Sequence, residues 1–131
     1  MDKSFLVEAD IEAGHRLIRQ LDEAGLTVTA ALWLYMTDSD EWRLFLAMPI
    51  VDEEGPKRAY EKVQEQLKSV AQHELSLQNI SVVSTSDDLI NLLSSAIVTG
   101  PGISNMRLTR NVISNVFIED AYIYRLQHAS A

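Results

Sequence analysis

The chain has 131 residues, of which 47% are hydrophobic, and its 19 acidic and 11 basic residues give a formal net charge of -8. This length and hydrophobic content fit a single domain, residues 1–131, with a core of ordinary size. The negative charge argues against nucleic acid and anionic membranes as partners, because both are negatively charged themselves. The sequence contains no cysteine, which excludes disulfides, thiolate metal ligands and thiol nucleophiles.

Two apolar stretches bear on location. Residues 5–7 are too few for the core of a secretory signal, and residues 26–37 are too few to span a bilayer. We therefore expect a cytoplasmic protein, which the lack of cysteine also favours. The charge is uneven, since residues 1–65 hold 14 acids and 7 bases whereas residues 66–131 hold 5 and 4.

The first half of the chain predicts a helix followed by a hairpin. Apolar residues at helical spacing predict a helix that begins near Val7 and ends before Gly25, where a left-handed C-cap fits. Two apolar runs, residues 30–36 and 44–51, follow and are separated by polar residues typical of a turn. Because successive side chains of a strand point to opposite faces, these continuous apolar runs need cover on both faces.

The second half predicts two helices and three strands. Pro56 fits the first position of a second helix, and residues 80–83 form a short third strand. Residues 86–88 provide a cap and an acidic first turn for a third helix over residues 89–97. The last two strands are expected at residues 103–109 and 116–126, where β-branched and aromatic residues dominate.

The resulting order, αββαβαββ, predicts an α+β fold with a five-stranded mixed β-sheet and three helices. Right-handed crossovers would make strands two, three and four parallel, each end of the sheet carrying an antiparallel hairpin partner. We expect the helices mainly on one face of this sheet. The other face would then lie in the interface of a homo-oligomer, most simply a two-fold dimer.

Aromatic residues supply the candidates for that contact surface, because aromatic side chains often anchor interfaces. They belong to the first hairpin and to the last strand. The candidates are Trp33, Tyr35, Trp42, Tyr122 and Tyr124. Burial in the chain's own core is the simpler expectation for each of them.

Carboxylates follow the second and third strands, at Asp52, Glu53, Glu54, Asp87 and Asp88. Ligands of open α/β sheets gather outside the carboxyl ends of strands, where hard oxygen atoms can hold Mg²⁺ or Mn²⁺. Arg110 or Asn111 at the end of the fourth strand would then contact a phosphate. Helix capping and the helix dipole explain the same acids without any metal.

Two acids, Glu119 and Asp120, interrupt the apolar last strand. An unpaired carboxylate in a sheet is costly, so each acid needs a cation beside it. If the hairpin turns at residues 113 and 114, Arg107 lies directly opposite Asp120 and Arg110 lies diagonal to Glu119. Structural ion pairs are the simpler interpretation, and a catalytic or ligand-binding site of these four residues is the alternative.

Two functions fit these observations. The first is a protein-interaction or oligomerisation module, acting as a homodimer or as the acidic partner of a basic protein. The alternative is a small enzyme or nucleotide-binding domain that depends on a divalent metal held by the carboxylates at the strand ends. We favour the first, because a binding surface needs only shape and apolar area whereas an enzyme needs convergent groups in a pocket.

Overall fold

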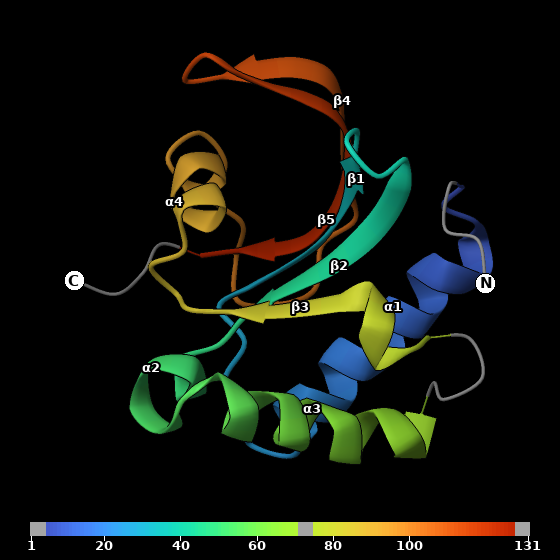
Figure 1. Cartoon of the computed structure of the whole chain (residues 1–131), viewed down its shortest axis with the longest axis vertical. Coiled ribbons are helices and arrows are strands. Elements are labelled where there is room, and N and C mark those ends of the chain that lie inside the picture. Colours follow the sequence, from blue (N-terminus) through green and yellow to red (C-terminus); the bar gives the residue numbers. More distant parts are fainter. Residues whose placement is uncertain (1–4, 71–74, 128–131) are drawn as a thin grey trace.

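The computed structural model describes residues 5–70 and 75–127, and it has one five-stranded mixed β-sheet with helices on both faces (Figure 1). Its helices are α1 (Glu8–Glu23), α2 (Ile50–Glu54), α3 (Pro56–Val70) and α4 (Asp88–Ser94), with a 3₁₀ turn at Leu77–Asn79. Its strands are β1 (Ala30–Met36), β2 (Glu41–Ala47), β3 (Ile80–Val83), β4 (Met106–Ile113) and β5 (Val116–Leu126). The predicted α+β class and mixed sheet are confirmed, with one helix more than expected.

The strand order is β3-β2-β1-β5-β4, and β2 and β3 form its one parallel pair within the described residues. The prediction of parallel neighbours is therefore correct for the second and third strands and wrong for the fourth. The strand β5 occupies the second edge of β1, so β4 lies at the far edge and runs opposite to β2 and β3. The connection through α4 thus joins the two edges of the sheet rather than two neighbouring strands.

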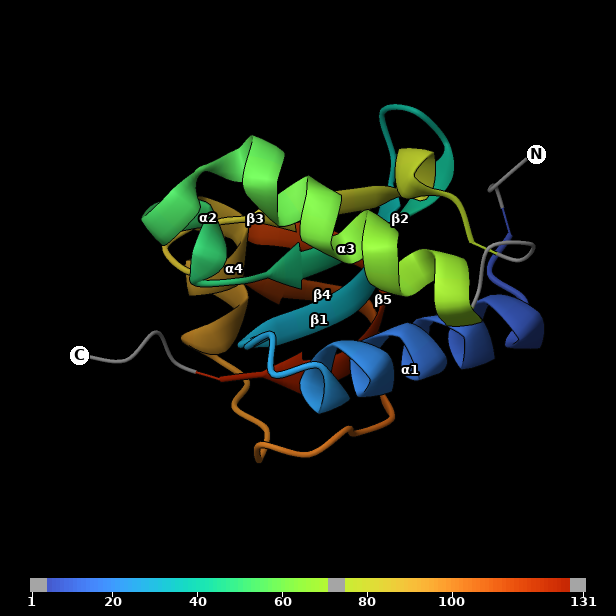
Figure 2. The same cartoon turned by 90° about the horizontal axis from the view of Figure 1, so that it is seen from below.

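The central strand β1 is covered on both faces by helices of the same chain. Ala31 and Trp33 pack with α1 and α3, whereas Leu32 and Leu34 pack with α4. Figure 2 shows α1 and α3 side by side on one face, with α4 behind the sheet. The helix α4 therefore covers this part of the second face, where we expected an oligomer interface.

Local chemistry sets the helix ends. At the start of α1, the Val7 N–H donates to the Asp10 carboxylate at 3.1 Å. The helix stops before Gly25, whose φ of 77° is the left-handed conformation that glycine tolerates best. The predicted strand over residues 44–51 ends early, at Ala47, because Pro49 has helical dihedral angles and is followed by α2.

Two polar clusters join α1 to the sheet. The Trp33 indole N–H donates to Tyr124 Oη at 3.1 Å, and Tyr124 donates to the Ile11 carbonyl of α1 at 2.6 Å. Arg125, 4% exposed, donates to the Asp22 carboxylate at 2.8 Å.

Within the described ranges, no helix has the length and apolar character needed to cross a membrane.

Candidate functional site

A groove of about 610 Å³ opens between the N-terminal segment, the β1–β2 turn and the β4–β5 hairpin. Its lining combines aromatic and aliphatic side chains with three carboxylates and one arginine. These residues are Phe5, Leu6, Tyr35, Asp40, Trp42, Arg107, Glu119 and Asp120. Acids and aromatic residues that the sequence offered as separate candidates are therefore brought together in one groove.

Arg107 and Asp120 form an ion pair with two hydrogen bonds in the groove. The Arg107 guanidinium donates from Nε to Oδ1 at 2.7 Å and from Nη2 to Oδ2 at 2.8 Å. The hydrogen bonds from Arg107 hold the pKa of Asp120 below its ordinary value, against the opposing effect of burial. Thr109 adds a weaker hydrogen bond to the same carboxylate at 3.3 Å.

The predicted cation beside each acid is confirmed, but the predicted register is wrong. The hairpin turns at Ser114 and Asn115, both at positive φ, one residue later than expected. Asp120 consequently faces Thr109, and Arg107 reaches it diagonally. The Arg110 Nε lies 3.6 Å from Glu119 Oε2.

The groove already contains one cation bound by an aromatic ring and a carboxylate together. The Arg107 Cζ lies 5.5 Å from the centre of the Trp42 ring while its nitrogens bind Asp120. Tyr35 packs edge-on against Trp42, with 5.7 Å between ring centres, and donates a hydrogen bond to Asp40. That hydrogen bond raises the pKa of Tyr35. The groove therefore has chemistry suited to a guanidinium or ammonium group.

The five aromatic candidates divide into a buried and a partly exposed set. Trp33, Trp42 and Tyr124 are 0%, 5% and 0% exposed, so they pack within this chain's own core. Tyr35 and Tyr122 are partly exposed. Tyr122 donates to Asn105 Oδ1 at 2.9 Å. Of the five, Tyr35 and Tyr122 thus have the greater area available for another molecule.

The carboxylates at the strand ends are brought only partly together. Asp52 accepts a hydrogen bond from Ser84 Oγ at 2.7 Å, so the carboxyl ends of β2 and β3 do meet as expected. Asp87 instead caps α4, accepting from the Leu89 N–H at 3.0 Å. Residues 53 and 54 line a separate hollow beside α2, and Asp88 lies in the first turn of α4. Among the described residues, no group of three His, Asp or Glu side chains is placed to hold a metal.

Three lining residues of the groove were not among the sequence candidates: Phe5, Leu6 and Asp40. Phe5 is 77% exposed, and an apolar pair before the first helix is a signal that could have indicated a surface contact. Asp40 was expected only as a turn residue. Its place in the groove depends on the fold bringing that turn beside β5.

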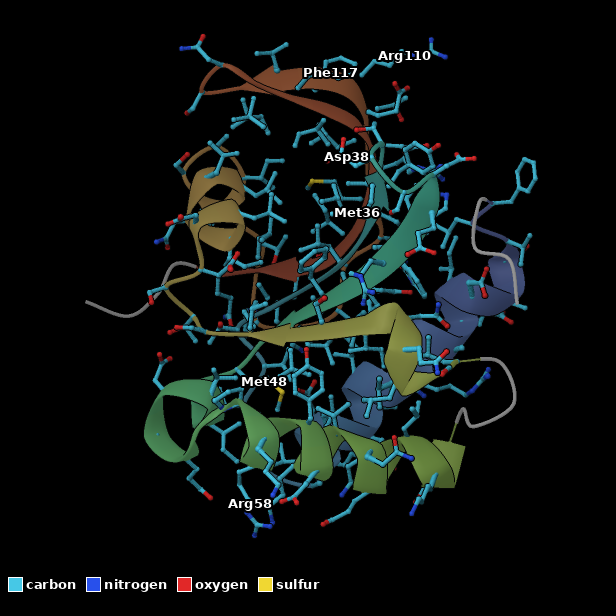
Figure 3. The ribbon with its side chains drawn as sticks, viewed as in Figure 1. Met36, Asp38, Met48, Arg58, Arg110 and Phe117 are labelled. Carbon is cyan, nitrogen blue, oxygen red and sulfur yellow. The ribbon has the colours of Figure 1, made fainter. Side chains whose placement is uncertain are left out.

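The end of the β4–β5 hairpin carries exposed apolar side chains. Val112 and Phe117 face each other across the hairpin and are 62% and 55% exposed. Val116 and Met106 of the same hairpin are 43% and 38% exposed. Figure 3 shows Phe117 and Arg110 at the end of the molecule that lies farthest from α3 and its Arg58. We refer to Val112, Val116 and Phe117 as the hairpin tip.

Comparison with known proteins returned no matching family model, no matching curated protein and no matching solved structure.

Proposed function

We propose that this protein is a protein-interaction module whose groove binds a basic segment of another protein chain. The proposal is based on the lining of the groove, where Asp40, Glu119 and Asp120 lie beside aromatic rings and a single arginine. Carboxylates supply charge complementarity to a cation, and the accessible rings of Phe5 and Tyr35 supply aromatic area. The partner therefore carries arginine or lysine next to apolar residues.

The electrostatics of the whole chain support the same class of partner. The net charge of -8 attracts basic segments over distances comparable with the Debye length, which is about 8 Å at physiological salt. The exposed apolar side chains at the hairpin tip are a second surface to which apolar residues of a partner can bind. A cytoplasmic setting remains a prediction.

Fluorescence anisotropy with two labelled octapeptides tests this proposal. One peptide alternates arginine with valine and phenylalanine, and the other has glutamate in place of each arginine. We expect micromolar binding of the arginine peptide, weakening with added salt, and much weaker binding of the glutamate peptide. Equal affinity for both peptides, or no binding of either, would overturn the proposal.

Two double variants that remove the same charge distinguish binding in the groove from attraction to the net charge of the protein. The double variant Asp40→Asn/Glu119→Gln removes two groove carboxylates, and Glu53→Gln/Glu54→Gln removes two exposed ones beside α2. We expect the first pair to weaken binding of the arginine peptide at least about fivefold and the second to change it little. Equal weakening by both pairs would show that net charge, and not the groove, attracts the peptide.

The metal-dependent alternative has a test of its own. It predicts that Mg²⁺ or Mn²⁺ raises the midpoint of thermal unfolding, because a ligand of the native state stabilises it by mass action. Asp52→Asn would abolish that increase. The hydrogen bonds of Asp52 to Ser84 and of Asp87 to its helix account for these carboxylates without an ion.

A further inference from the structure

We infer that Arg107 occupies, in the free protein, the position that an arginine of the partner takes when it binds, and that this position selects arginine over lysine. This inference rests on the proposed function, since it names the residue that the groove recognises and the internal contact that restrains its binding. It requires a position shaped for a guanidinium, an internal guanidinium that can leave, and a reason why lysine fits less well.

The position that Arg107 occupies is shaped for a guanidinium. Both oxygens of Asp120 accept from the same planar group, at 2.7 and 2.8 Å. The Trp42 ring adds an aromatic face, with its centre 5.5 Å from Arg107 Cζ. Thr109 Oγ1 donates to Asp120 at 3.3 Å, and Tyr35 packs edge-on against Trp42. The carboxylate and the ring are therefore each held by a neighbour other than Arg107.

The Arg107 guanidinium can leave this position. Its side chain is 46% exposed, so water can solvate it as it leaves, and an ion pair exposed to this extent contributes little. The buried Arg125 differs, because it is bound by three separate segments of the chain. Trp42 is 5% exposed and the Asp120 side chain is 22% exposed. Departure of Arg107 therefore opens an aromatic face and a carboxylate together.

The groove keeps negative charge for a second cation while Arg107 is in place. Asp40 accepts its hydrogen bond from Tyr35, and this phenol is neutral, so the contact leaves the charge of Asp40 in place. Glu119 is held only loosely, since Arg110 Nε lies 3.6 Å from its Oε2. Both carboxylates line the groove together with Arg107. They attract an incoming cation to the position that Arg107 holds.

Lysine fits this position less well than arginine. A guanidinium is planar, and it can donate two parallel hydrogen bonds to one carboxylate while it stacks on an aromatic face. A lysine ammonium is a compact and strongly hydrated charge that has no planar pair of donors. Arg107 itself shows the planar arrangement, with both Asp120 oxygens bound and Trp42 alongside. We therefore expect the preference for arginine to increase when Arg107 is removed.

Peptide binding to Arg107→Ala provides the first test. Fluorescence anisotropy compares the arginine octapeptide described above with the same peptide carrying lysine in place of each arginine. We expect Arg107→Ala to bind the arginine peptide about fivefold more tightly than the unmodified protein, because an internal competitor worth one exposed ion pair is gone. We expect a much smaller gain for the lysine peptide.

The matched control is Arg110→Ala, which removes the same charge from a residue that is also paired with a groove carboxylate but does not line the groove. We expect it to strengthen the binding of both peptides to the same small extent. If Arg107→Ala weakens binding of the arginine peptide, leaves it unchanged, or strengthens both peptides equally, the inference is wrong.

Thermal unfolding with two small cations provides the second test, which needs no peptide. The cation n-propylguanidinium matches the end of an arginine side chain, and n-propylammonium has the same charge without the planar group. At equal millimolar concentrations, we expect n-propylguanidinium to raise the unfolding midpoint of Arg107→Ala more than n-propylammonium does. The two cations should act alike on Arg110→Ala. Because each variant is compared with itself, a loss of stability in Arg107→Ala does not obscure the result. Equal effects of the two cations on Arg107→Ala would contradict the inference.

The two proposals can fail separately. If the unmodified protein binds the arginine peptide and Arg107→Ala gives no gain, the proposed function stands and the inference is refuted. If peptide binding occurs only after Arg107→Ala, the inference is supported, and the proposed function is overturned for the unmodified protein, whose groove Arg107 then closes. Absence of peptide binding in both proteins would overturn both.

Discussion

At the scale of single residues, Gly14 of α1 packs directly against Tyr124 of β5. A Cβ on residue 14 would overlap Tyr124 Oη and lie 3.0 Å from its Cζ. The hydroxyl cannot easily yield, because it is buried and hydrogen-bonded to Trp33 and to the Ile11 carbonyl. Burial also raises the pKa of Tyr124, so the phenol stays neutral.

We expect Gly14→Ala to lower the free energy of unfolding by about 2 kcal/mol through overpacking. Urea titration followed by tryptophan fluorescence measures this, since Trp33 lies at the same contact. The control is Gly100→Ala, whose added Cβ would meet nothing within 4 Å. Equal stability of both variants would show that α1 shifts away from Tyr124 at little cost.

The ion pair of Arg107 and Asp120 predicts a stability that depends on pH. The pKa of Asp120 is lower in the folded protein than in the unfolded chain. The charge of Asp120 therefore stabilises the fold above the unfolded pKa, which is near 4, and this stabilisation is lost as the pH falls through the lower folded pKa. We expect Asp120→Asn to cost about 1 kcal/mol at pH 7, and we expect that cost to shrink towards pH 3. Urea unfolding of both proteins at several pH values measures the difference.

The control for this prediction is Asp38→Asn in the exposed β1–β2 turn. We expect its cost to be small at both ends of the pH range. A cost of Asp120→Asn that stays constant from pH 7 to pH 3 would mean that the carboxylate's charge is not what stabilises the hairpin.

At the scale of elements, α4 depends on its cap. Asp87 accepts hydrogen bonds from the Leu89 and Ile90 N–H groups, at 3.0 and 3.4 Å, and the helix has only seven residues. We expect Asp87→Ala to cost about 1 kcal/mol and Asp87→Asn to cost little, because asparagine caps equally well. Thermal melts with and without Mg²⁺ measure both. An increase with Mg²⁺ that Asp87→Asn abolishes would instead indicate a metal ligand.

Local patterns were enough to locate most elements, because their signals lie within a few residues. The stripe of α1, the apolar run of β1 and the proline of α3 each predicted an element that the structure contains. The order of the sheet was beyond such patterns. No pattern within β5 indicates that it pairs with β1, some 90 residues earlier, because β1 is apolar on both faces and so does not select one neighbour by its pattern.

The site was predictable to the same limited degree. The two acids within the apolar strand β5 predicted that a cation lies beside each of them, and Arg107 and Arg110 were correctly named as these cations. We placed the turn one residue too early, which shifted the predicted partner of Asp120 by two residues, from Thr109 to Arg107. The groove itself could not be predicted, because Phe5, Asp40 and Asp120 meet only through the tertiary fold.

At the scale of the whole molecule, Arg125 joins three distant segments. Its guanidinium binds the Asp22 carboxylate, the Val28 carbonyl and the Gly102 carbonyl. We expect Arg125→Met to cost roughly 2 kcal/mol, less than for fully buried pairs because the Asp22 side chain is 38% exposed. Arg110→Met, with a side chain 78% exposed, should change stability little. Urea unfolding of the two variants checks this, and equal costs would refute it.

The position of β5 between β1 and β4 also concerns how the protein is made. When only the first 110 residues have left the ribosome, one edge of β1 has no partner strand. Trp33 then also lacks Tyr124, its hydrogen-bond partner in the folded protein. The sheet cannot close until residues 116–126 leave the exit tunnel, so the longest-range pairing forms last. During that interval an apolar strand is open to mispairing, which makes the nascent chain a candidate for chaperone binding.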